Sequence, residues 1–151
     1  MNLIAPLITP DTALLDMSFS SKKKLFEHAA ELLAEAHGLK STDIFTSLFE
    51  RERLGSTALG YGIAITHGRI KGLKDARGAF YRLKTPLEFD APDNQPVSLC
   101  FILLVPKDAN ERHLQILGEL AQLFGDEAMR TKLLTADTPS ELIALLESWS
   151  S

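Results

Sequence analysis

The chain has 151 residues, a formal net charge of −4 at pH 7 and 45% hydrophobic residues, a composition typical of a globular protein. Lysine and arginine are scattered along it, so no basic surface predicts binding to nucleic acid. The longest apolar run, residues 97–105, is too short to cross a membrane, and the N-terminus lacks the pattern of a signal peptide. We therefore expect one cytoplasmic domain over residues 1–151, without membrane insertion.

Two amphipathic helices are expected before residue 55. Apolar residues at helical spacing predict the first over residues 20–36, with Gly38 ending it. The second is expected to have Ser41 as its cap and to run to about Leu54, with the charged sequence ERER in its last turn. The apolar faces of the two helices contain Leu25, Phe26, Ala29, Leu32, Leu33, Ala36, Ile44, Phe45, Leu48 and Phe49.

Two or three strands are expected in the middle of the chain, a short one over residues 62–66 and longer ones over residues 76–83 and 97–105. The third is an almost unbroken apolar run, which predicts a central strand with helices covering both faces. It contains Cys100, the only cysteine, which we expect to be a buried and inert thiol.

Three further helices are expected in the last third. Two are predicted over residues 110–124 and 126–134, and the last begins where Thr138, Pro139 and Glu141 form the pattern of a capping box. Helices, then strands, then helices predict an α/β fold, with helices on both faces of a mixed sheet.

Several common catalytic motifs are excluded. There is no P-loop, and the sequence GYG at residues 60–62 lacks the third glycine and the helix of a dinucleotide fingerprint. No strand-turn-helix nucleophile elbow surrounds Ser56. Neither an HExxH pattern nor a histidine-cysteine cluster is present, so no metal and no cofactor are predicted. The four histidines are His28, His37, His67 and His113.

His67 differs from the other histidines in its surroundings. It follows the apolar residues 63–65, so the strand is expected to end there and His67 to project from that end. Gly68 then allows a tight turn and offers a backbone N–H to an anion. Imidazole has a pKa near ~6.5 and is a nucleophile at pH 7. The pattern favours a covalent intermediate over a metal site, but it is also typical of a polar residue at a strand exit.

Four other residues carry groups suited to a site around His67. The Arg51 guanidinium offers paired hydrogen bonds to phosphate, Ser56 and Thr57 add hydroxyls in a glycine-bounded loop, and His113 lies in the first turn of its helix. Each also has a structural explanation. Arginine complements the dipole at a helix end, hydroxyls are common in turns, and His113 is accounted for as an exposed polar residue.

The sequence RERLGSTALGYGIAITHGRI, residues 51–70, resembles the type-2 IIA components of the bacterial phosphoenolpyruvate-dependent phosphotransferase system (PTS), the fructose/mannitol class. The family pattern is an arginine, then G-S-T-G-x-G, then G-x-A-x-P-H-G. Three further stretches, SKKKLFEHAAELLA, LEFDAPDNQPVSLCFILLVP and NERHLQIL, are similar to family segments, so the resemblance extends over nearly the whole chain. Several motifs in the right order are more specific than any one of them.

The resemblance implies a three-layer α/β/α fold and a phosphoryl group accepted from an HPr-like carrier. His67 is then the phosphorylated residue, Arg51 steadies the phosphoryl charge, and His113 lies beside the nucleophile. The residues expected to bind the phosphoryl group are Ser56, Thr57, Thr66 and Gly68.

Two positions depart from the family pattern. Thr66 stands where the family has proline, and Ala58 replaces a glycine. Threonine restores a backbone donor that proline lacks and adds a hydroxyl. These changes bear on the rate and affinity of phosphoryl transfer more than on its chemistry.

Within the family, the chain is most similar to the stand-alone nitrogen-regulatory form. This implies a phosphorylated HPr-like carrier of the nitrogen branch (NPr) as donor, and regulated targets such as sensor kinases or potassium transport proteins. Two alternatives remain: a sugar-specific IIA component that passes phosphate to a membrane permease, and a binding module that is not phosphorylated, which Thr66 suggests. The candidate residues for docking a carrier are Tyr61, Ile70 and Leu73, of which the last two are core residues in the alternative interpretation.

Overall fold

The computed structural model describes residues 3–108 and 110–149, and within them the strands form one five-stranded sheet in the order β1-β4-β5-β3-β2. The pairs β1·β4 and β3·β5 are parallel, whereas β4·β5 and β2·β3 are antiparallel. The predicted mixed sheet is therefore confirmed. The strands are β1 (Ala13–Met17), β2 (Ala58–Gly60), β3 (Ile63–Ile70), β4 (Arg77–Leu87) and β5 (Val97–Pro106).

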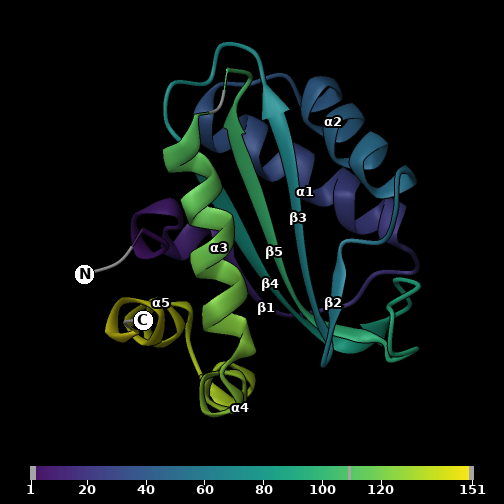
Figure 1. Ribbon diagram of the computed structural model, residues 1–151, viewed down its shortest axis with the longest axis vertical. Coiled ribbons are helices and arrows are strands. Elements are labelled where there is room, and N and C mark those ends of the chain that lie inside the picture. The colour runs from purple at the N-terminus through teal and green to yellow at the C-terminus, as the bar shows by residue number, and fades with distance from the viewer. Residues whose placement is uncertain (1–2, 109, 150–151) are drawn as a thin grey trace.

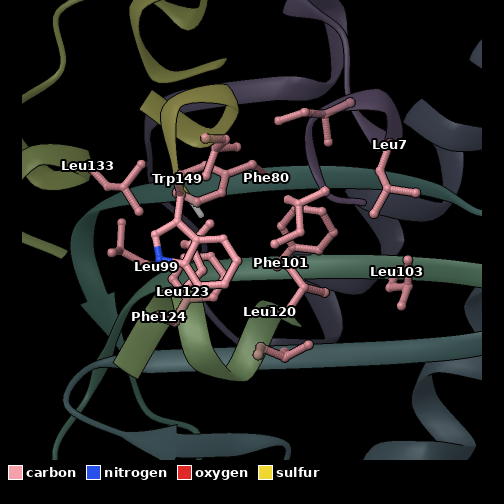
Figure 2. Packing of buried hydrophobic residues seen from close by; sticks show 14 of the residues in the cluster. Leu7, Phe80, Leu99, Phe101, Leu103, Leu120, Leu123, Phe124, Leu133 and Trp149 are labelled. Carbon is pink, nitrogen blue, oxygen red and sulfur yellow. The ribbon is translucent and has the colours of Figure 1, made fainter. Parts of the chain in front are cut away.

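Helices cover both faces of this sheet, as predicted (Figure 1). On one face lie α1 (Lys22–His37) and α2 (Ser41–Arg53), and on the other lie α3 (Glu111–Gly125), α4 (Glu127–Thr135) and α5 (Pro139–Ser148). Two short 3-10 helices, η1 (Ala5–Leu7) and η2 (Pro10–Thr12), precede β1. Each face has its own apolar cluster, and Figure 2 shows the one beneath α3, where Phe80, Phe101 and Phe124 pack together.

The central strand β5 is buried along nearly its whole length, because both clusters take side chains from it in alternation. Leu99, Phe101 and Leu103 point toward α3, whereas Cys100 and Ile102 point toward α1 and α2. Burial raises the pKa of the Cys100 thiol well above its ordinary value. The expectation of a buried thiol is thus confirmed, and the raised pKa favours the less reactive protonated form.

Most predicted helix ends are confirmed. Gly38 ends α1 at φ 66°, as predicted. The helix begins two residues later than expected, after Ser21, which caps it by accepting from the Lys24 N–H at 3.2 Å. Thr138 caps α5 by accepting from the Glu141 N–H, but the Glu141 carboxylate accepts from Asp137 rather than from Thr138. The expectation for Ser41 is wrong. Ser41 lies inside α2, whose N-cap position is Lys40, and no side chain caps that end.

The strand that carries His67 is longer than expected. β3 continues to Ile70, paired residue by residue with β5 from Ile63↔Leu99 to Ile70↔Pro106. Thr66, His67 and Gly68 therefore do not leave the sheet, because the long apolar strand beside them extends the pairing beyond their own apolar run. The strands β1 and β2 were not expected from the sequence, and β4 extends four residues beyond the predicted end at residue 83.

Candidate phosphoryl-accepting site

The alternation of side chains along β3 determines which residues share a face. Ile63 and Ile65 belong to the cluster beneath α3, whereas Ala64 and Ile70 belong to the cluster beneath α1 and α2. By the same alternation His67 lies on the α3 face. Thr66 and Gly68 lie on the α2 face, so the predicted site residues are divided between the two sides of one strand.

Beyond Ala64, the outer edge of β3 faces α2 and the loop after it instead of a neighbouring strand. The pairing with β2 ends at Ala64, and the Ile65 N–H donates to Thr57 O at 3.2 Å. Farther along, the Arg69 N–H donates to Ser47 Oγ at 2.9 Å. Since alternate N–H groups of a strand point to the same edge, the His67 N–H points toward this edge and the Gly68 N–H toward β5.

Gly68 serves close packing and not a turn. A Cβ at this position would lie 2.7 Å from Ser47 Oγ and 3.4 Å from Leu48 Cδ2. The absence of a side chain lets α2 lie directly against β3. The tight turn expected at Gly68 is therefore wrong, and its N–H is directed at the neighbouring strand.

A pocket of about 580 Å³ opens where α2 crosses this edge of the sheet. His67 contributes to its wall, together with three arginines and one acidic residue, Glu50. Positive charge therefore predominates around the imidazole. The arginines are Arg51, Arg53 and Arg69.

The surroundings of His67 favour its neutral form. Burial lowers the pKa of His67 below its ordinary value, and the positive charges of Arg51 and Arg69 lower it further. The ring is only partly buried, so it remains accessible to a partner. A neutral imidazole with an available lone pair is the nucleophilic form, and cations nearby are suited to an incoming phosphoryl group.

Arg51 and Arg69 approach His67 from different elements. Arg51 comes from the last turn of α2, and its Nη1 donates to Gly55 O at 3.0 Å. Arg69 is on β3, two residues after His67 and on the same face. Arg69 is not among the site residues predicted from the sequence, because the apolar run stops at Ile65 and the strand is expected to end there. In a longer strand, the two-residue spacing from His67 would have identified it.

The predicted hydroxyl ligands lie elsewhere. Ser56 Oγ donates to Phe89 O and accepts from the Ala58 N–H. Thr57 and Thr66 are buried, and their hydroxyl oxygens are 2.7 Å apart. None of these three residues lines the described pocket.

His113 lies in the first turn of α3, as expected. Its Nδ1 accepts from the Asn110 N–H at 3.2 Å, while Asn110 Oδ1 caps the helix. Because Nδ1 accepts, the proton of neutral His113 is on Nε2. α3 begins at the end of the sheet where β3 ends and covers the face that carries His67 (Figure 1). His113 does not line the pocket itself.

The candidate docking residues are not gathered around the pocket. Tyr61 is exposed at the turn between β2 and β3, but Ile70 is buried and Leu73 packs against the core beneath α1 and α2. Two leucines outside the predicted set, Leu54 and Leu114, are exposed. Leu54, 86% exposed, lines the pocket, and Leu114 follows His113.

Neither a metal cluster nor a membrane-spanning helix is found in the part of the chain that the structure describes. Within residues 3–108 and 110–149, no three side chains of histidine, cysteine, aspartate or glutamate are placed to hold one ion. No helix within the same residues has the length and apolar character needed to cross a bilayer.

Comparison with known proteins identifies the family. The family model described as phosphoenolpyruvate-dependent sugar phosphotransferase system, EIIA 2, matches residues 6–149. The chain belongs to this family of PTS IIA components, whose members carry phosphoryl groups. The resemblance seen in the sequence is thus confirmed.

The particular relatives are nitrogen regulatory proteins. One from Bradyrhizobium diazoefficiens is 36% identical over 143 residues, covering 95% of this chain and 94% of that protein. Another, from Klebsiella oxytoca, is 42% identical over 127 residues, covering 83% and 78%. The crystal structure of nitrogen regulatory protein IIA-Ntr from Neisseria meningitidis matches with a TM-score of 0.91 and 48% identity, covering 96% of this chain and 99% of that one.

Proposed function

We propose that this IIA protein accepts a phosphoryl group on His67 and regulates partner proteins through its phosphorylation state. The observation that carries the proposal is the position of a half-buried imidazole in a pocket with three arginines, where burial and positive charge lower its pKa and favour the neutral form. Phosphoryl transfer requires mainly alignment and stabilisation of charge, and these groups supply both. The chain's own residues thus suffice for the acceptor side of the reaction.

The step exchanges one nitrogen–phosphorus bond for another. A ring nitrogen of His67 attacks the phosphorus of a phosphohistidine on the donor, and the bond to the donor imidazole breaks as the new bond forms. The donor nitrogen regains its lone pair, and each ring keeps the proton on its other nitrogen. The donors on this chain that would meet the phosphoryl oxygens are the guanidinium groups of Arg51 and Arg69 and the backbone N–H of His67.

The proposed donor and targets are those of a nitrogen-regulatory IIA protein. Those that are 36% and 42% identical are nitrogen regulatory proteins, which supports an HPr-like carrier of the nitrogen branch (NPr) as the phosphoryl donor. Sensor kinases and potassium transport proteins are the regulated targets that we propose. Both roles place the protein in the cytoplasm.

Incubation with the phosphorylated carrier tests this function. We expect an acid-labile phosphoryl group on the wild-type protein and none on His67→Ala. His37→Ala should be labelled normally, because His37 is on α1, which covers the face of the sheet opposite to His67. Label that persists in folded His67→Ala would contradict the assignment. If the wild type accepts no label from any carrier, the protein is the binding-only module.

A sugar-specific role is the second candidate. The family description itself refers to a sugar phosphotransferase system, and the fructose-specific EIIA component of Haloferax volcanii is 34% identical over 120 residues. Labelled protein mixed with permease membranes and sugar separates the two roles. Transfer of label to the sugar favours this candidate, and retention on His67 favours regulation.

A further inference from the structure

Glu52 is a buried carboxylate beside Arg51. It lies in the last turn of α2 and is 8% exposed. Ile44 and Leu48 precede it at four-residue spacing and are fully buried, so Glu52 continues the face of α2 that packs on the sheet. A carboxylate in that position is costly unless it is paired and hydrogen-bonded.

The Glu52 carboxylate has partners from two other segments. Lys22, at the start of α1, places Nζ 3.0 Å from Oε2. Thr57 donates to Oε1 from its hydroxyl at 2.6 Å and from its N–H at 3.2 Å. The charge is thus balanced by α1, and the hydrogen bonds fasten α2 to the loop after it.

These hydrogen bonds continue into β3. A carboxylate only accepts, so the Thr57 hydroxyl donates to Glu52 and receives its own hydrogen bond from Thr66, at 2.7 Å. Thr66 precedes His67 in β3. The family's proline has no hydroxyl, so this link from α2 to the strand of the nucleophile is specific to the threonine.

Arg51 lies between two points where α2 is anchored to β3. One turn earlier, Ser47 Oγ accepts from the Arg69 N–H at 2.9 Å and lies 3.3 Å from Arg69 O. The second anchor is Glu52. The hydrogen bond described for the Arg51 guanidinium reaches only Gly55, within the same helix end. Its position relative to His67 therefore depends on how α2 is held.

We propose that Glu52 is a positioning residue that fixes the last turn of α2 against β3, so that Arg51 stays beside His67. Lys22 and Thr57 hold its carboxylate, and Thr66 extends the anchor to the strand of the nucleophile. The expected effect of Glu52 on the rate of phosphoryl transfer rests on the proposed function, whereas its expected effect on the pKa of His67 does not.

The His67 pKa separates positioning from a simple change of charge. Loss of the negative charge of Glu52 would by itself lower the pKa of His67. Displacement of Arg51 would raise it, because Arg51 is one of the charges that depress it. The other charged groups of the pocket, Glu50, Arg53 and Arg69, are unchanged in a Glu52 variant, as is His113 on α3.

NMR titration of His67 in the full-length, unphosphorylated protein is the test, with Arg51→Gln, Glu52→Gln and the double variant. We expect the pKa to rise in each single variant and to rise no further in the double variant, since both act through one guanidinium. Glu35→Gln is the matched control, because it removes the same charge from an exposed position on α1. We expect phosphoryl transfer to Glu52→Gln to be slower by roughly 10- to 100-fold.

Two milder variants guard against misfolding. Thr57→Val removes the hydroxyl that contacts both Glu52 and Thr66, and Thr66→Val removes the last link. We expect the His67 pKa to rise in both variants, and to rise less in Thr66→Val than in Thr57→Val. The proposal is overturned if Glu52→Gln and Thr57→Val are folded and their His67 pKa equals that of the Glu35→Gln control. If the pKa rises but no protein accepts label, the positioning role stands and the phosphoryl function fails.

Discussion

Gly68 lies where α2 packs directly against β3, next to Ser47 and Leu48. Ser47 cannot rotate away from an added Cβ without losing its bonds to Arg69. We therefore expect Gly68→Ala to destabilise the protein by about 1–3 kcal/mol, the usual cost of overpacking, and to slow phosphoryl transfer by displacing α2. Thermal unfolding and labelling by the carrier measure the two effects. Gly118→Ala is the control, because no neighbouring atom lies within 4 Å of an added Cβ there, and unchanged stability in Gly68→Ala would contradict the packing argument.

Arg69 is expected to affect the pH dependence of phosphoryl transfer, because its charge lowers the pKa of His67. In the proposed transfer, His67 must be neutral to attack phosphorus, so we expect the rate to fall as the pH drops through the His67 pKa. Burial, Arg51 and Arg69 depress that pKa, so the fall occurs below the ordinary range for histidine. In Arg69→Gln we expect the fall at higher pH and a lower maximal rate. Arg53 lines the same pocket but is not among the charges that lower the His67 pKa, so Arg53→Gln should keep the wild-type pH profile. An Arg69→Gln protein with the wild-type pH profile would exclude this role for Arg69.

At the scale of secondary-structure elements, β3 shows what the local sequence can and cannot predict. Its apolar run stops at Ile65, and Thr66, His67 and Gly68 look like a strand exit. The strand continues because β5 is long enough to pair with it as far as Ile70, and such pairing is non-local. β2 is three residues of a glycine-bounded segment, which has the composition of a loop.

The helices were more predictable than the strands, because their periodicity and capping residues are local. Even so, α2 ends in ERER, a sequence typical of a charged, exposed helix end, whereas Glu52 within it is buried. The four-residue spacing from Ile44 through Leu48 was the available signal. The motif points to His67 and Arg51, but it could not show that Thr57 and Thr66 are buried against each other and do not line the pocket, since that depends on how α2 and its loop pack on β3.

In the whole molecule, the two helical layers have different relations to the site. α1 and α2 contribute Lys22, Glu52 and Arg51, and they hold one another through the buried carboxylate. In the opposite layer, α3 covers the face of the sheet that carries His67. Besides the apolar cluster, Arg82 of β4 binds this layer to the sheet through hydrogen bonds. That arginine is 7% exposed, and in the register of the sheet it pairs with Leu99, the residue that also faces Ile63.

Arg82 connects the end of α4 to the sheet. Its Nη1 donates to Leu133 O at 3.1 Å and to Ala136 O at 2.7 Å, and the other nitrogens contact the Asp16 carboxylate. In Arg82→Met, the two carbonyls lose their donor, at a cost of about 1–3 kcal/mol for each buried group left unpaired. Asp16 adds little to this, since its side chain is 62% exposed and returns to water.

We therefore expect a lower unfolding midpoint in denaturant for Arg82→Met, with Arg82→Lys intermediate because lysine keeps the charge but cannot reach both carbonyls and Asp16 together. The folded fraction should still accept phosphate at the wild-type rate, because Arg82 lies four residues along the sheet from the level of His67. Chemical denaturation and carrier labelling at low temperature separate the two effects. A slow but fully stable Arg82→Met protein would show instead that the α4 layer acts on the site itself.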